Sequence, residues 1–205
     1  MREIVQCIPN FSEGRRKQVV EAIVEQIKAV KGVNLLDYSM DHNHNRSVVT
    51  FVGDKQGVAE AAFLAVAKAV ELIDMREHQG GHPRMGAADV VPFVPVSGVT
   101  MADCVEIAHK VGKRIGEELN VPVYLYEEAA TRPERRNLAE VRRGEYEGLQ
   151  KTITEAERLP DYGPAVFNPK AGATAVGARL PLVAFNVNLH TDNLDIAKKI
   201  ARSVR

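Results

Sequence analysis

Residues 33–52 read VNLLDYSMDHNHNRSVVTFV, and this stretch decides the fold. Residues 33–38 and 47–52 are rich in side chains that favour β-strands, and the polar run at 40–46 between them is typical of a hairpin loop. The sequence therefore predicts two neighbouring strands here.

A strand and a helix are predicted before this hairpin. Residues 4–8 form a short β-prone run, and the PNFSEG segment at 9–14 can continue neither a strand nor a helix, so we expect a turn there. An apolar stripe with the i, i+3, i+4, i+7 spacing of one helical face follows, made of Val20, Ile23, Val24 and Ile27. This helix is expected to end at about residue 30.

A second helix and a fourth strand are predicted after the hairpin. Residues 58–73 carry a long apolar stripe with many alanines, which would allow close packing on a sheet. Residues 89–96 are β-prone, and Pro92 and Pro95 favour an edge or bulged position for this strand. The order strand, helix, strand, strand, helix, strand is typical of an α+β, ferredoxin-like sheet with both helices on one face.

An extra helix and strand follow this unit. TMAD at 100–103 resembles a capping box, so a helix is expected to begin there and to continue to 119, with a fifth strand at 121–126. Residues 132–158 are highly charged and are interpreted as a surface helix rather than core, with a solvated arm as the favoured alternative. The proline- and glycine-containing segment 160–172 is interpreted as a long ordered loop or linker.

The C-terminal residues are typical of the start of another α/β unit. Residues 180–189 are strongly β-prone, and a helical stripe follows at Ala197, Ile200, Ala201 and Val204. One strand and one helix cannot bury a core of their own, so this tail should need the first domain, another chain or further residues. We therefore expect a first domain at 1–178 and the truncated beginning of a second at 179–205.

Composition excludes several classes of protein. The 205 residues include 27 basic and 27 acidic side chains, so no net charge favours nucleic acid or an anionic membrane as a partner. No stretch approaches the roughly 20 apolar residues of a membrane span. Cys7 and Cys104 lie in apolar stretches without a Cys-x-x-Cys spacing, which indicates buried reduced thiols. We expect a cytoplasmic protein.

The loop between the second helix and the fourth strand concentrates groups that can do chemistry. It reads HQGGHPRMGAAD at residues 78–89. Imidazole titrates near neutral pH, so His82, flanked by glycine and proline, is a candidate general acid and base. A single loop histidine is more often a surface or capping residue, and the residues alone favour that interpretation.

Two other kinds of site are considered and not predicted. His78 and His82 have the spacing of a helical zinc site, but the intervening glycines and the following proline oppose a helix. His42 and His44 add no cysteine or glutamate at ligand spacing, so no metal is expected. GATAVG at 172–177 lacks the Gly-Lys-Ser/Thr ending of a phosphate loop.

Ordered blocks along the whole chain resemble the glutamate formimidoyltransferase family. The first four are CIPNFSEGR at 7–15, NRSV at 45–48, IDM at 73–75 and HPRMGA at 82–87. The likeness continues through VPVYLY at 121–126, RGEYE at 143–147, PDYGP at 160–164, GAT at 172–174 and AFN at 184–186. Several blocks in order are far more specific than any one of them.

This resemblance implies a one-carbon transferase of histidine breakdown. The family moves a formimidoyl group from N-formimidoyl-L-glutamate to N5 of tetrahydrofolate, its co-substrate, between two α/β subdomains of a protein that is usually a homodimer. The catalytic histidine of the family corresponds to His82. Its folate-binding segment corresponds to Gly163, Pro164, Ala165, Val166, Phe167, Asn168, Pro169, Lys170, Ala171 and Gly172.

The implied chemistry suits several charged residues. N5 must lose a proton and the departing glutamate nitrogen must gain one, so one histidine can serve both steps. Both substrates carry carboxylates, which Arg84, Arg179 and Lys170 could hold. Asp37 or Asp41 could orient His82 or hold the cationic amidine.

Chain length and the chemistry of the donor leave alternatives to a complete formimidoyltransferase. Members of the family continue well beyond residue 205, so we expect a truncated chain or one half of a split enzyme that binds folate poorly and turns over slowly alone. The chain could instead be a non-catalytic folate-binding half. A related folate enzyme that transfers a formyl group is the other alternative.

Overall fold

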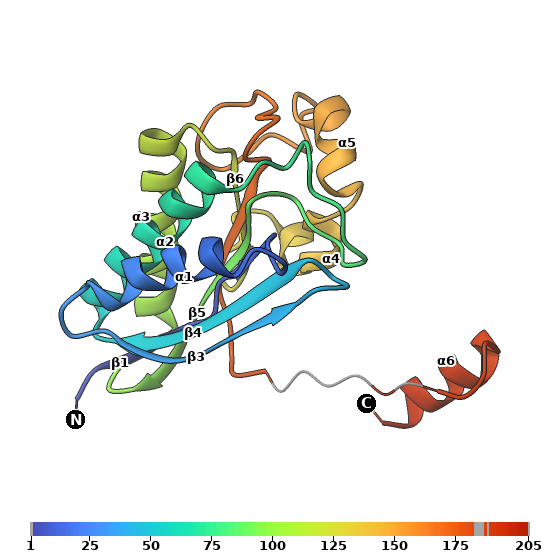
Figure 1. Cartoon of the computed structure of the whole chain (residues 1–205), viewed down its shortest axis with the longest axis horizontal. Helices are drawn as coiled ribbons and strands as arrows, with labels where there is room; N and C mark the ends of the chain where they lie inside the picture. The colour runs from blue at the N-terminus through green and yellow to red at the C-terminus, as the bar shows by residue number, and fades with distance from the viewer. Residues whose placement is uncertain (1, 183–186, 188, 205) are drawn as a thin grey trace.

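The chain folds around one mixed β-sheet of seven strands (Figure 1). The computed structural model describes residues 2–182, 187 and 189–204. The strands are β1 (Ile4–Cys7), β2 (Asn10–Phe11), β3 (Asn34–Asp41), β4 (Arg46–Gly53), β5 (Ala88–Ser97), β6 (Val123–Glu127) and β7 (Thr174–Ala178). The architecture is α+β, as the sequence predicts.

Three long helices alternate with these strands. They are α1 (Lys17–Lys28), α2 (Lys55–Leu72) and α3 (Met101–Leu119). They lie together against one face of the sheet (Figure 1), where their apolar stripes form the main core. The predicted capping box is confirmed, because the hydroxyl of Thr100 accepts from the Asp103 amide at 3.2 Å and Asp103 accepts from the Thr100 amide at 2.8 Å.

The strand order places the N-terminal strands in the middle of the sheet. Antiparallel pairs join β3 to β4, β4 to β1 and β2, and β1 and β2 to β5. Parallel pairs then join β5 to β7 and β7 to β6. Because side chains alternate between the two faces of a strand, Val49 and Phe51 of β4 reach the helical core while Val48 and Thr50 face the other side.

The prediction of a turn after the first strand is wrong in part. The PNFSEG segment was expected to turn, yet β2 lies within it and pairs with the same two neighbours as β1. Pro9 interrupts the strand without redirecting it, and its carbonyl oxygen accepts from the Val49 amide at 3.0 Å.

The predicted edge position of the fourth strand is wrong, because β5 is central in the sheet. Its register with β1 does shift, as predicted for a bulge. Pro92 lies opposite the break between β1 and β2, where the ladder is already irregular.

The charged segment 132–158 is not one surface helix. It divides into η1 (Pro133–Arg136), α4 (Leu138–Val141) and α5 (Glu145–Thr152). The break before α5 comes from left-handed backbone at Gly144 (φ 84°) and Glu145 (φ 53°). Buried apolar side chains from α4 and α5 pack with Tyr124 and Tyr126 on the second face of the sheet, so this segment covers part of that face.

A strand that the sequence analysis missed completes the sheet. β7 lies between β5 and β6, after the predicted linker, and all five of its residues are buried. Its sequence, TAVGA, has only one strongly β-prone apolar side chain, so its strand propensity is low. The small residues fit a tight space, because a Cβ on Gly177 would lie 2.6 Å from the Tyr126 ring.

The C-terminal helix is confirmed as α6 (Leu194–Ser203). The described residues of the predicted strand 180–189, which are 180–182, 187 and 189, are not in a strand, and the others lie outside the described residues. Leu194, Ile196, Ile200 and Val204 are exposed on or beside α6. Within the described part of the chain, no helix has the length and apolar character needed to cross a membrane.

Candidate active site

A hollow of about 560 Å³ lies on the second face of the sheet, the face opposite α1, α2 and α3. Alternate residues of β1, β4 and β5 form its floor, and the segment around α4 and the residues after β7 form its sides. Three guanidinium groups line it, from Arg46, Arg142 and Arg179. Apolar side chains line much of the hollow as well, and its three guanidinium groups outnumber the one carboxylate among its described residues, that of Glu127, so positive charge predominates there.

Arg46 and Arg142 are only partly satisfied within the protein. Arg46 donates to the Asn10 side chain, and Arg142 donates to the buried carboxylate of Asp89. The Nε atoms of both arginines are buried and have no hydrogen-bond partner among the described residues. Burial lowers the pKa of Arg46. Both side chains are half-buried at the hollow, and guanidinium groups in such a position are suited to binding a carboxylate.

His82 lies near this hollow in a half-buried position. Its pKa is lowered by burial, and by the positive charges of Arg46 and Arg142. The Nδ1 atom lies 2.7 Å from the Pro83 carbonyl oxygen. Because a carbonyl can only accept, Nδ1 carries the proton in the neutral ring and Nε2 keeps its lone pair. This geometry provides a proton acceptor at neutral pH.

The hairpin loop between β3 and β4 brings a second histidine to His82. The rings of His44 and His82 are edge to face, with centroids 6.0 Å apart. Asp41 accepts from the His44 amide at 2.9 Å, and its other oxygen lies 2.7 Å from Nδ1 of His44. Asp41 thus holds His44, which faces His82. Asp37 is exposed at a bulge of β3, opposite Thr50.

Two predicted carboxylate-binding residues are engaged in other contacts. Arg84 donates to Glu147 at 2.8 and 2.5 Å and to Glu145 at 3.1 Å, and its side chain is only 12% exposed. Lys170 donates to the Glu71 carbonyl oxygen at 2.8 Å. Arg179 does line the hollow, where its Nη1 donates to the Leu180 carbonyl oxygen at 3.0 Å.

The segment 163–172 runs beside the residues that follow His82. Gly172 forms an antiparallel bridge with Gly86, and the Ala171 carbonyl oxygen accepts from the Ala87 amide at 2.9 Å. Asn168 fixes the turn before them by accepting from the amides of Lys170 and Ala171. The structure therefore joins this segment to the base of the His82 loop, whereas the His82 ring itself faces His44.

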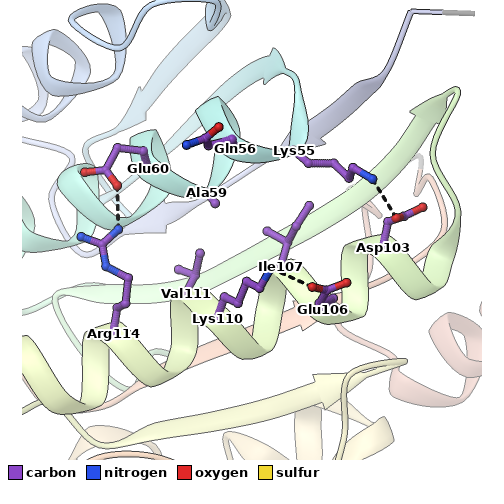
Figure 2. A pocket seen from close by; sticks show the side chains of 10 residues that line it. All are labelled: Lys55, Gln56, Ala59, Glu60, Asp103, Glu106, Ile107, Lys110, Val111 and Arg114. Atoms are coloured by element: carbon purple, nitrogen blue, oxygen red, sulfur yellow. Dashed lines mark hydrogen bonds and ion pairs between the residues drawn. The ribbon is translucent and has the colours of Figure 1, made fainter.

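A second hollow, of about 490 Å³, lies between α2 and α3 on the helical side (Figure 2). Ala59, Ile107 and Val111 contribute apolar surface to it. Its charged side chains pair across the two helices, as in Lys55–Asp103 and Arg114–Glu60, and along α3, as in Lys110–Glu106 (Figure 2). The hollow is separated from His82 by the sheet and carries no comparable free donors among its described residues.

The histidines do not form a metal-ligand cluster with acidic or thiol groups in the described part of the chain. His78 is buried, and its Nε2 atom lies 2.9 Å from the Asn45 carbonyl oxygen. His44 pairs with Asp41 as described above.

Sequence reasoning did not place Arg46 and Arg142 in the hollow. Arg46 belongs to the NRSV block, but its place in a polar hairpin suggested turn capping. Arg142 lies in the charged segment that was interpreted as surface. A signal was available in Asp89, an acidic residue at the start of a buried strand, because a buried carboxylate requires a cationic partner.

Comparisons with known proteins agree with the blocks of sequence that surround this site. The family described as "Formiminotransferase domain, N-terminal subdomain" matches residues 4–179. Glutamate formimidoyltransferase of Streptococcus pyogenes serotype M1 is 57% identical over 100% of this chain and 69% of its own length. The enzyme of the same name from Thermoplasma acidophilum is 52% identical over 98% of this chain and 67% of its own length.

A longer relative shows the same match. Formimidoyltransferase-cyclodeaminase of Rattus norvegicus is 50% identical over 100% of this chain, which spans 38% of that protein. The matches include His82, its loop and the strands that form the hollow, since they extend over the full chain. The chain therefore belongs to the formiminotransferase family and contains its N-terminal subdomain.

Proposed function

We propose that this chain takes part in the transfer of a formimidoyl group from N-formimidoyl-L-glutamate to N5 of tetrahydrofolate, with His82 as the acid and base. The observation that carries the proposal is a half-buried histidine with a lowered pKa beside a hollow lined by arginines. The relatives named glutamate formimidoyltransferase support the choice of reaction.

The proton transfers follow from the state of His82. As N5 attacks the formimidoyl carbon and a new C–N bond forms, the Nε2 lone pair takes the proton that N5 loses. The imidazolium then returns this proton to the glutamate nitrogen, and the bond from that nitrogen to the carbon breaks. Such acid–base catalysis contributes about 10² to 10⁴ in rate, and a lowered pKa keeps the ring neutral at the start.

Arg46, Arg142 and Arg179 are proposed to bind substrate carboxylates. All three line the hollow, whereas the donors of Arg84 already meet two glutamates. The segment 163–172 is proposed as the folate-binding wall, with its position fixed through Gly86 and Ala87. Asp41 is proposed to act through His44 rather than on His82 directly.

We also propose the finer features of organisation. The order β3-β4-β1/β2-β5, with α1 and α2 on one face, supports a ferredoxin-like unit to which β6 and β7 are added. The proposed first subdomain is 1–178, in agreement with a family match that ends at 179. A cytoplasmic homodimer is the proposed state, and two buried free cysteines support the compartment.

The test uses the chain together with the C-terminal part of the Streptococcus pyogenes relative that lies beyond the match. His82→Ala should lower kcat by about 10² to 10⁴ while the affinity for tetrahydrofolate stays within about twofold. His109→Gln, on the helical side of the sheet, is the matched control. If the unmodified protein binds folate but does not turn over, the proposal is wrong. It is also wrong if the protein accepts N-formyl-L-glutamate as donor but not N-formimidoyl-L-glutamate.

A further inference from the structure

The RGEYE block at 143–147 contains contacts that the proposed function does not use. Gly144 and Glu145 are consecutive residues with positive φ, and Glu145 has the side-chain strain of that conformation. The turn that they form directs Glu145 and Glu147 to Arg84, two residues after His82. The cost of this strained backbone indicates that the contacts of Glu145 and Glu147 with Arg84 have a function.

Arg84 closes the base of the loop that carries His82. Its Nε atom donates to Nδ1 of His78 at 3.3 Å, so the first and last residues of the loop 78–84 are joined. Because arginine can only donate, Nδ1 of His78 accepts and Nε2 carries the proton to the Asn45 carbonyl oxygen at 2.9 Å. Glu147, Arg84, His78 and Asn45 thus form a continuous polar chain from α5 to the β3–β4 hairpin.

Tyr146, between the two glutamates, also contacts the segment 163–172. The Tyr146 amide donates to the Arg84 carbonyl oxygen at 2.9 Å, and the Tyr146 hydroxyl donates to the Pro169 carbonyl oxygen at 2.6 Å. The rings of Tyr146 and Phe167 lie 5.3 Å apart. Residues 145–147 therefore contact both the His82 loop and the segment 163–172.

We infer that Arg84 is a positioning residue, and that Arg84, Tyr146 and Glu147 form a clasp that fixes the His82 loop relative to the segment 163–172. This inference rests on the proposed function only for the task of His82. Arginine is required because its planar fork meets Glu147 with two donors while Nε meets His78, an arrangement that lysine cannot make. A substrate carboxylate would have to displace Glu147 from a side chain that is 12% exposed.

The clasp can be tested without turnover, by NMR titration of the isotope-labelled histidines of the 205-residue chain. Arg84→Lys keeps the positive charge and removes the fork and the Nε contact. We expect it to move the His82 titration to higher pH, toward the ordinary value, as the loop becomes more hydrated. Amide exchange in 79–83 should also become at least about 10-fold faster. Arg136→Lys is the matched control, since Arg136 meets Glu128 in an exposed pair.

Two further variants separate the arms of the clasp. Glu147→Gln should reproduce the Arg84→Lys effect on His82. Tyr146→Phe, which removes only the hydroxyl bond to Pro169, should accelerate exchange in 167–172 and leave the His82 titration in place. In the complemented enzyme, Arg84→Lys should lower kcat by about 10 to 100-fold with little change in KM, because displacing a catalytic group by about 1 Å can cost 10² in rate.

A different result would overturn the inference. If Arg84→Lys raises the KM for N-formimidoyl-L-glutamate while the His82 titration and kcat stay unchanged, Arg84 binds substrate instead. A change in thermal stability alone, with no effect on His82, would also contradict the clasp. If the unmodified enzyme has no transferase activity, the proposed function fails, and the titration still decides the role of Arg84.

Discussion

Gly86 and Gly172 form a backbone bridge in which neither residue has space for a side chain. A Cβ on Gly86 would lie 2.4 Å from the carbonyl oxygens of Ala171 and Ala173, and one on Gly172 would lie 2.1 Å from that of Met85. The backbone that follows His82 and the backbone of the segment 163–172 are therefore in direct contact at these two glycines. Gly172 also has a φ of 68°, which favours glycine.

Gly86→Ala should therefore destabilise the chain by about 3 kcal/mol or more, because backbone must move to admit the methyl group. Urea unfolding followed by circular dichroism measures the change. Gly148→Ala is the control, since nothing lies within 4 Å of that Cβ. In helix α5 it should be neutral or stabilise by up to about 1 kcal/mol. Equal effects of the two substitutions would contradict the close approach.

The ion pair of Arg135 with Asp161 is buried, with side chains 5% and 7% exposed and a distance of 2.6 Å. Arg135→Met leaves the Asp161 charge without its cation and should cost about 3 to 5 kcal/mol in the free energy of unfolding. Arg136→Met breaks an exposed pair with Glu128 and should cost less than about 1 kcal/mol. Thermal unfolding of both variants measures the contrast, and similar values would refute it.

His78 should make stability depend on pH. Burial lowers its pKa below the usual 6.5, so the neutral ring contributes stability that is fully present above 6.5. This contribution is lost as the pH falls through the folded-state pKa. His78→Gln retains a donor and an acceptor without titrating, and should lose less stability than the unmodified chain between pH 7.5 and about pH 5. Urea midpoints at both pH values test this, and parallel losses would count against it.

The acid limb of kcat should lie below pH 6.5. Burial, Arg46 and Arg142 lower the pKa of His82, so the base form persists to lower pH than in an ordinary histidine and activity falls as pH drops through that lowered pKa. Arg46→Met removes one of the charges and should move the limb to higher pH. Steady-state rates from pH 5 to 8 provide the measurement. A limb that stays fixed in Arg46→Met would exclude His82 as the titrating base.

Ligand binding should depend on the same arginine. Arg46→Met should weaken binding of 5-formyltetrahydrofolate, a stable folate with glutamate carboxylates, by about 10-fold or more, as expected for a charge-assisted hydrogen bond. Calorimetry on the complemented enzyme measures the affinity. Lys110→Met, in the hollow between α2 and α3, is the control. A comparable loss in the control would show that net charge matters rather than the site.

The parts of the fold that could be predicted are those with strong local signals. The stripes of α1 and α2, the hairpin of β3 and β4 and the cap of α3 follow from periodicity and side-chain type. β7 could not be predicted, because its small residues are chosen by the space beside Tyr126 rather than by strand propensity. The strands that pair with it, β5 and β6, lie far before it in the sequence.

The candidate site divides in the same way. His82 could be proposed from a loop of titratable and flexible residues, and the resemblance gave it a role. The positions of Arg46 and Arg142 depend on β4, α4 and Asp89 meeting on one face, which only the folded sheet brings about. Arg84 was predicted to bind a substrate carboxylate, but it pairs with Glu147 instead. The sequence around Arg84 does not reveal this distant partner.

The insertion of β7 between β5 and β6 has a consequence for biosynthesis. β7, which pairs with β5, is synthesised some 75 residues after β5. Until β7 has left the ribosome, β5 has one unpaired edge. Chains released before residue 174 would retain that open edge. Premature termination in this interval should therefore give aggregates rather than a smaller folded protein.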